Sequence, residues 1–130
     1  ILREGKDVTI IGCGTMVSES LQAAEILQKE KISARVVNMH TIKPIDEEMI
    51  ILCAKKTGAI VSAEEHQING GLGSAIAEVL VKNHPVPMEM VAVRDTFGES
   101  GAPQELLKAY HLKDVDIAAA AQRAIKRKSA

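Results

Sequence analysis

Short apolar runs recur along the chain, and each of them predicts a strand. Residues 8–11 form a β-branched run that ends at a glycine turn, and similar runs occupy residues 34–39, 59–64 and 88–93. Short continuous apolar runs bounded by turn residues are typical of strands that are buried on both faces. The pattern therefore predicts strands that are covered on both sides.

Apolar residues recur at helical spacing between and after these runs. The predicted helices cover residues 17–29, 46–57, 72–83, a short stretch at 103–109 and a last segment that opens at Asp114 or Asp116. Asp46 is a residue type that caps the start of a helix, and Gly58 stands where a left-handed glycine ends one. Both ends of the second helix therefore carry a sequence signal.

Strands that alternate with helices favour a parallel sheet with helices on both faces. We therefore expect an α/β fold, a three-layer α/β/α sandwich with a mainly parallel sheet of about four to five strands. The chain has no internal repeat or linker, so residues 1–130 are expected to form one domain. Because the chain opens with Ile1 and enters a strand within a few residues, we expect that domain to be a fragment of a longer chain.

The balance of charges argues against two classes of partner. Sixteen basic and 17 acidic residues give a net charge of −1, and only 2% of the residues are aromatic. Nucleic-acid binding depends on a basic surface or on stacking aromatic residues, so no nucleic-acid partner is expected. No apolar run approaches the ~18 residues that cross a bilayer, so no membrane partner is expected and a cytoplasmic location is the default.

Glycine turns follow the first and third strands, where an open parallel sheet can hold a ligand. In such sheets ligands collect beyond the carboxyl ends of the strands, at the point where the strand order reverses. With the order 2-1-3-4 that point lies between the first and third strands. The candidate anion-site or interface residues there are Gly12, Gly14, Thr15, Gly70, Gly71, Gly73 and Ser74.

Glu64, Glu65 and His66 form the densest titratable cluster and complete this candidate site. At a strand end that faces a glycine loop, they suit acid–base chemistry or the binding of a partner. A structural alternative is that one glutamate caps or braces the glycine loop while His66 hydrogen-bonds backbone across a domain interface. The residues alone leave both interpretations open.

Other sites are disfavoured by spacing. A dinucleotide fingerprint would need a third glycine where Val17 stands, and no Walker lysine follows either glycine turn. Cys13 and Cys53 are far apart and form no CxxC pair, so neither a zinc site nor a redox motif is indicated. No metal-binding residue is therefore predicted.

Several motifs together carry a resemblance to a known family. They are DVTIIGCG at 7–14, LQAAEIL at 21–27, TIKPID at 41–46, EEH at 64–66, GGLG at 70–73, FGESG at 97–101 and ELL at 105–107. In this order, and over essentially the whole chain, they resemble the C-terminal domain of transketolases. The same superfamily includes 1-deoxyxylulose-5-phosphate synthase and the β subunits of 2-oxo-acid dehydrogenases.

The resemblance implies a role within a larger enzyme. Transketolases use thiamine diphosphate, with magnesium at its diphosphate, to carry a two-carbon ketol unit from a ketose phosphate to an aldose phosphate. The cofactor lies between a pyrimidine-binding and a diphosphate-binding domain, and the resemblance places neither in this chain. It therefore implies a structural or assembly domain with no catalytic residue, no cofactor bound by the domain alone, and no activity alone. The implied partners are those two domains, in a homodimer or heterotetramer of the full enzyme. The alternatives are the C-terminal domain of a related thiamine-diphosphate enzyme, either 1-deoxyxylulose-5-phosphate synthase or a 2-oxo-acid dehydrogenase β subunit, and a regulatory anion- or partner-binding module.

Overall fold

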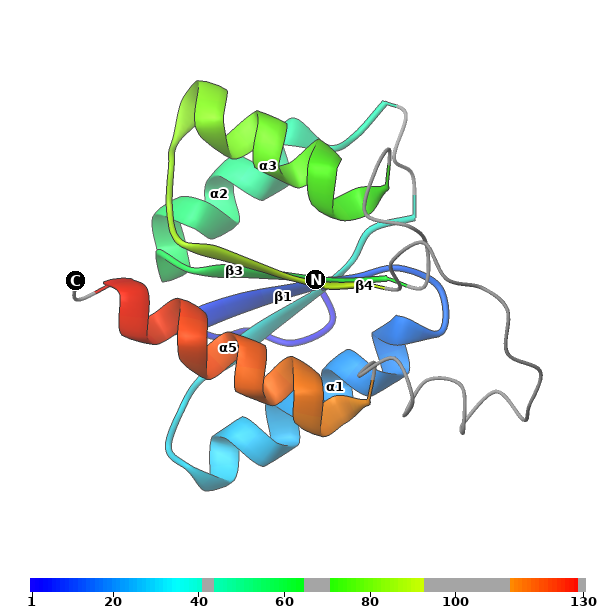
Figure 1. The fold of residues 1–130 in the computed structure, drawn as a ribbon, viewed down its shortest axis with the longest axis vertical. Helices are drawn as coiled ribbons and strands as arrows, with labels where there is room; N and C mark the ends of the chain where they lie inside the picture. The colour runs from blue at the N-terminus through cyan, green and yellow to red at the C-terminus, as the bar shows by residue number, and fades with distance from the viewer. Residues whose placement is uncertain (41–43, 65–70, 93–112, 129–130) are drawn as a thin grey trace.

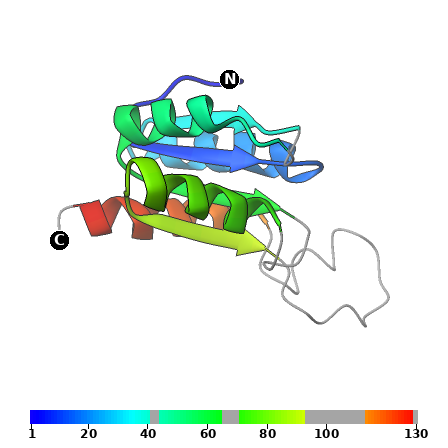
Figure 2. The same ribbon diagram turned by 90° about the horizontal axis from the view of Figure 1, so that it is seen from above.

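The computed structural model describes residues 1–40, 44–64, 71–92 and 113–128. Within them the chain forms a four-stranded sheet with the order β2-β1-β3-β4. All neighbouring strands are parallel, and Figure 2 shows the strand arrows pointing the same way. The strands are β1 (Val8–Gly12), β2 (Ala34–Asn38), β3 (Ile60–Glu64) and β4 (Met88–Ala92).

Helices cover both faces of the sheet. They are α1 (Met16–Lys29), α2 (Glu47–Thr57), α3 (Leu72–Asn83) and α5 (Asp114–Lys128). In Figure 1, α2 and α3 lie on one face of the sheet and α1 and α5 lie on the other. The three-layer sandwich predicted from the sequence is confirmed, whereas the short helix predicted at 103–109 lies outside the described residues.

Alternating strand positions build a separate core on each face, because successive side chains of a strand point to opposite sides. Ile10 and Val36 belong to the core beneath α1 and α5. Their neighbours Ile11 and Val37 belong to the core beneath α2 and α3. Both faces therefore depend on the same strands, which explains why the strands read as continuous apolar runs.

The ends of α2 follow the local rules that predicted them. The side chain of Asp46 accepts a hydrogen bond from the backbone N–H of Met49 at 3.1 Å, which satisfies a donor that the first turn leaves free. Gly58 ends the helix with a φ of 71°, in the left-handed region that favours glycine. Among the described residues, no helix is both long and apolar enough to cross a membrane.

The N-terminal segment packs along the edge strand β2. Arg3 and Val36 form an isolated antiparallel bridge. Gly5 then passes so close to β2 that an added Cβ would lie 2.2 Å from the carbonyl carbon of Ala34 and 2.3 Å from the backbone nitrogen of Arg35. The absence of a side chain at position 5 is therefore what lets this segment reach its place.

The last turn of α5 contacts two segments that are distant from it in the sequence. The Lys128 ammonium donates to the backbone carbonyl of Asp7 at 2.7 Å and to that of Thr57 at 2.8 Å. These contacts join the approach to β1 with the end of α2. One lysine side chain therefore links three segments that are far apart in the sequence.

Candidate functional site

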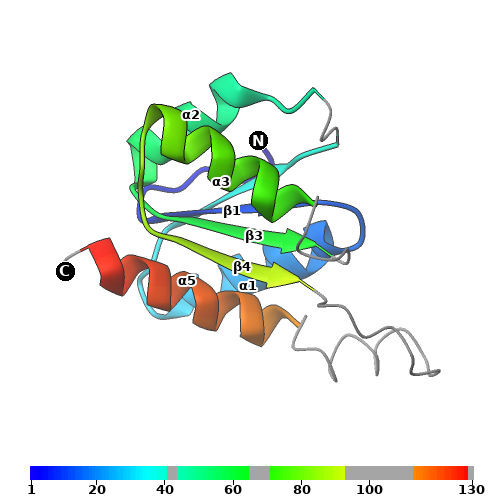
Figure 3. The same cartoon turned by 45° about the horizontal axis from the view of Figure 1, so that its top comes forward.

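The carboxyl ends of β1 and β3 meet at the predicted reversal of strand order. Gly12 pairs with Ala63 across the two strands, and the N–H of Cys13 donates to the carbonyl of Ala63 at 3.2 Å. From this point α1 leaves toward one face of the sheet and α3 covers the other, as Figure 3 shows. Each helix therefore begins at the same edge, where ligands of open parallel sheets collect.

The first glycine turn is shaped by close packing at one position and by backbone conformation at another. A Cβ on buried Gly12 would lie 2.9 Å from the hydroxyl of Ser20 in α1. Gly14 is exposed and has a φ of 64°, a conformation that costs a residue with a side chain about 1–2 kcal/mol. Thr15 occupies the N-cap position of α1 and is exposed.

Glu64 ends β3. Its side chain is completely buried, and both of its carboxylate oxygens accept hydrogen bonds. One carboxylate oxygen accepts the N–H of Leu72 at 2.9 Å and the other accepts the N–H of Gly73 at 2.6 Å. These are free donors in the first turn of α3, where a negative charge is also favoured by the helix dipole. Glu64 therefore braces the start of α3, which is the structural role considered for one of the two glutamates.

The second glycine turn brings α3 close to the sheet. Gly71 is the N-cap residue of α3 and has extended backbone, with a φ of −97°. A Cβ on Gly73 would lie 3.0 Å from the hydroxyl of Ser62 and 3.0 Å from the sulfur of Met90. Ser74 follows in the first turn and is half-buried. The three remaining members of the predicted site, Glu65, His66 and Gly70, lie outside the described residues.

We expect Gly73→Val to lower the free energy of unfolding by about 1–3 kcal/mol, because a branched side chain cannot fit between α3 and the sheet without displacing Met90. Gly73→Ala is the graded companion, since it adds only the Cβ. Urea denaturation followed by circular dichroism measures both variants. A valine variant as stable as the parent chain would show that the close approach is not needed.

The cysteines and acidic residues offer little independent chemistry. Cys13 is half-buried and Cys53 is buried; burial raises the pKa of the Cys53 thiol, although the Arg35 charge opposes that effect. The described part of the chain holds no group of three or more His, Cys, Asp or Glu residues that could bind a metal ion. Among the described residues, the Glu64 carboxylate is occupied by two backbone N–H groups.

A second buried glutamate was not singled out by the sequence. Glu19, in α1, is 6% exposed, and its carboxylate accepts the N–H of Asp114 at the start of α5 at 2.9 Å. Glu19 thus accepts a backbone N–H at the start of α5, as Glu64 does at the start of α3. A spacing of 95 residues separates the partners, so the available signal was an acidic residue on the mainly apolar buried face of α1.

Relatives of known sequence and structure match nearly the whole chain. Residues 1–117 match the family described as "Transketolase, C-terminal domain". The chain is 50% identical over 129 residues to the 6-deoxy-6-sulfo-D-fructose transketolase subunit SqwH of Clostridium sp. (strain MSTE9). This match covers 99% of this chain and 40% of that protein. The chain is also 42% identical over 132 residues to 1-deoxy-D-xylulose-5-phosphate synthase of Desulforudis audaxviator (strain MP104C). This match covers 100% of this chain and 21% of that protein.

A solved structure agrees with these sequence matches. A split-gene transketolase, described as an inactive beta4 tetramer, superposes with a TM-score of 0.95 at 52% identity, covering 98% of this chain and 42% of the other. The chain thus spans about two-fifths of the length of this protein and of the Clostridium subunit. The fold, the motif order and the matched residues lead to one conclusion: the chain belongs to the transketolase C-terminal domain family.

Proposed function

We propose that this chain is the C-terminal part of a transketolase, the enzyme that transfers a two-carbon ketol unit from a ketose phosphate to an aldose phosphate. The observation that carries the proposal is 50% identity to a transketolase subunit over 99% of the chain. In the complete enzyme, thiamine diphosphate supplies the carbanion chemistry. The cofactor and Mg²⁺ bind in the pyrimidine- and diphosphate-binding domains, which lie outside residues 1–130.

Within that enzyme the chain has a supporting and assembling role and is inactive alone. Two observations support this role. Glu64, the acidic residue of the candidate site that the structure describes, is turned inward onto α3, and the similar split-gene structure is described as an inactive tetramer. The carboxyl edge of the sheet, where Gly14, Thr15 and Ser74 lie, is the surface we assign to contact with the cofactor-binding domains.

A second candidate is the C-terminal domain of a 1-deoxyxylulose-5-phosphate synthase. It is favoured by 42% identity over the entire chain. Both candidates predict the same supporting role and differ in the product that the complete enzyme makes. Product analysis therefore separates them.

We expect ketol transfer to appear only when this chain is mixed with a polypeptide that supplies the two cofactor-binding domains, with thiamine diphosphate and Mg²⁺ present. The chain and the complementing polypeptide are each assayed alone and then together. One arm follows transfer from a ketose phosphate to an aldose phosphate, a second uses 6-deoxy-6-sulfofructose as donor, and a third follows 1-deoxyxylulose 5-phosphate. Light scattering after size exclusion reports association in every mixture.

The outcomes are distinct. Transfer only in the mixture supports the transketolase assignment, and the donor arm that responds identifies the substrate. Formation of 1-deoxyxylulose 5-phosphate alone favours the second candidate. Activity of the isolated chain, or association without any activity in the three arms, contradicts the proposed role.

A further inference from the structure

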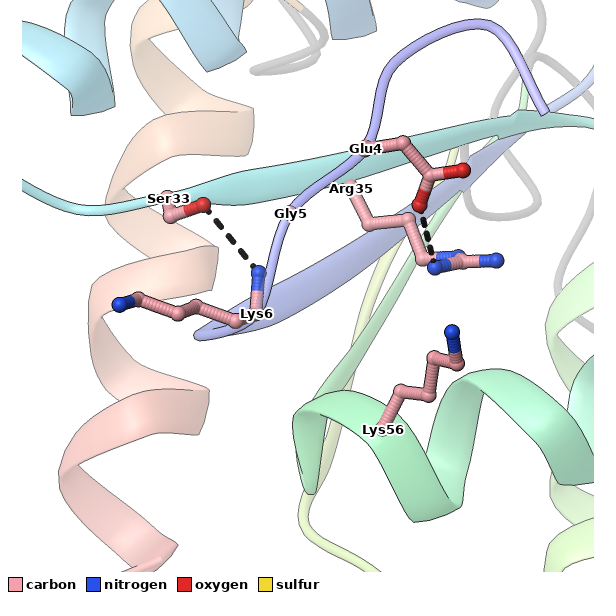
Figure 4. A pocket seen from close by; sticks show the side chains of 6 residues that line it. All are labelled: Glu4, Gly5, Lys6, Ser33, Arg35 and Lys56. Atoms are coloured by element: carbon pink, nitrogen blue, oxygen red, sulfur yellow. Dashed lines mark hydrogen bonds and ion pairs between the residues drawn. The ribbon is translucent and has the colours of Figure 1, made fainter.

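A pocket of about 410 Å³ lies at the opposite end of the sheet from the glycine turns. It opens where the N-terminal segment, the start of β2 and the last turn of α2 come together (Figure 4). The lining residues are Glu4, Gly5, Lys6, Ser33, Arg35 and Lys56. Because these residues precede or begin the strands, the pocket is separate from the carboxyl edge that carries the candidate interface.

Arg35 gives the pocket a buried positive charge. Its side chain is 2% exposed, and one terminal nitrogen donates to the Glu4 carboxylate at 2.8 Å. Among the described residues, the Nε of Arg35 has no hydrogen-bond partner. A guanidinium withdrawn from water needs its donors satisfied, so Arg35 retains unused capacity to bind an acceptor.

Glu4 is a weak counterion for this arginine. Its side chain is 74% exposed, while that of Arg35 is almost completely buried. An ion pair with one solvated partner gains little from mutual attraction. A small anion with several acceptor oxygens could therefore compete with Glu4 for the same guanidinium.

Lys56 adds a second cation on the facing wall. Figure 4 shows its side chain extending from α2 toward the Arg35 guanidinium, whereas the side chain of Lys6 points away. No ion pair of Lys56 is found within the described part of the chain. The pocket thus has two convergent cations and one carboxylate.

The partial negative charge at the end of α2 does not cancel the positive charge of Arg35 and Lys56. The carbonyl ends of a helix carry partial negative charge, and α2 ends beside the pocket at Thr57. Lys128 donates to the Thr57 carbonyl at 2.8 Å, which places a further positive charge against the negative end of the helix.

We propose that this pocket binds a phosphate group, with Arg35 as the forked donor and Lys56 as a point charge. Arginine suits tetrahedral oxyanions because its donors are planar and fixed, and hydrogen bonds between charged groups are the strong ones. The volume falls within the range of small-molecule sites, so the phosphate is either free or carried as a monoester of a small metabolite. Binding joins the N-terminal segment, β2 and α2 through one ligand.

The test is calorimetric titration of the folded chain with inorganic phosphate and, separately, with glycerol 3-phosphate, at constant ionic strength. We expect saturable binding that Lys56→Gln weakens by about fivefold. Lys55→Gln removes an exposed lysine from the same helix that does not line the pocket, and it should leave the affinity unchanged. Glu4→Gln removes the competing carboxylate and should tighten binding.

Cooperative thermal unfolding first verifies that each variant is folded. Tighter binding of glycerol 3-phosphate indicates a metabolite as the natural source, whereas equal affinity indicates free phosphate; both support the site. Absence of saturable binding up to millimolar concentrations overturns the proposal. So does an equal loss in the Lys55 and Lys56 variants, or an unchanged affinity in Glu4→Gln.

Discussion

Glu64→Gln is expected to lose about 2–4 kcal/mol of its free energy of unfolding. The carboxylate accepts two backbone N–H groups at the start of α3 and is completely buried. A glutamine of the same shape presents an oxygen to one of these donors but turns its NH₂ group toward the other. One buried N–H is thereby left unsatisfied, and the favourable interaction with the helix dipole is lost. Urea denaturation monitored by circular dichroism gives the value.

Glu78→Gln is the matched control for this variant. Glu78 lies on α3, the helix that Glu64 supports, but its side chain is exposed and pairs with Lys82 on the surface. Its replacement should leave the denaturation midpoint nearly unchanged. If the two variants were equally stable, Glu64 would not be supporting α3, and the buried carboxylate would need another explanation.

Gly5→Ala should cost about 3 kcal/mol, although alanine adds only one methyl group. The new Cβ would lie 2.2 Å from the carbonyl carbon of Ala34 and 2.3 Å from the backbone nitrogen of Arg35. Backbone atoms within a sheet cannot swing aside as a flexible side chain can, so the N-terminal segment has to move off β2. Chemical denaturation measures the loss, and amide hydrogen exchange at Leu2 and Arg3 shows whether their bonds to Val36 are released.

Gly14→Ala is the control that separates the cost of steric overlap from the cost of an unfavourable backbone conformation. A Cβ at Gly14 meets nothing within 4 Å, and the cost there comes from a φ of 64° alone. We expect about 1 kcal/mol at this position. A loss at Gly5 no greater than that at Gly14 would contradict the tight packing of the N-terminal segment.

The architecture could be predicted from the sequence because its signals are local. Asp46 and Gly58 mark the two ends of α2 through bonds and backbone angles within one turn. The apolar runs identify strands buried on both faces, and their alternation with helices identifies a parallel sheet. Each of these inferences depends on residues that are neighbours in the chain.

The roles of buried charged residues could not be predicted in the same way. Glu64 suited both acid–base chemistry and bracing a loop, and only the placement of α3 against the end of β3 decides which donors reach it. Arg35 stands in an apolar strand, and its counterion Glu4 comes from a segment 31 residues earlier. Such partners are set by tertiary packing, which spacing along the sequence does not encode.

The place of α5 in the sandwich bears on how the chain folds during synthesis. The core that contains Ile10 and Val36 is closed by α5 residues such as Ile117 and Ala121, whereas the opposite core is closed by α2 and α3. The contact between Lys128 and Asp7 spans 121 residues. This face of the sheet is therefore covered only by α1 until α5 has left the ribosome, and a nascent chain halted before α5 would expose the remaining apolar strand surface to chaperones and to aggregation.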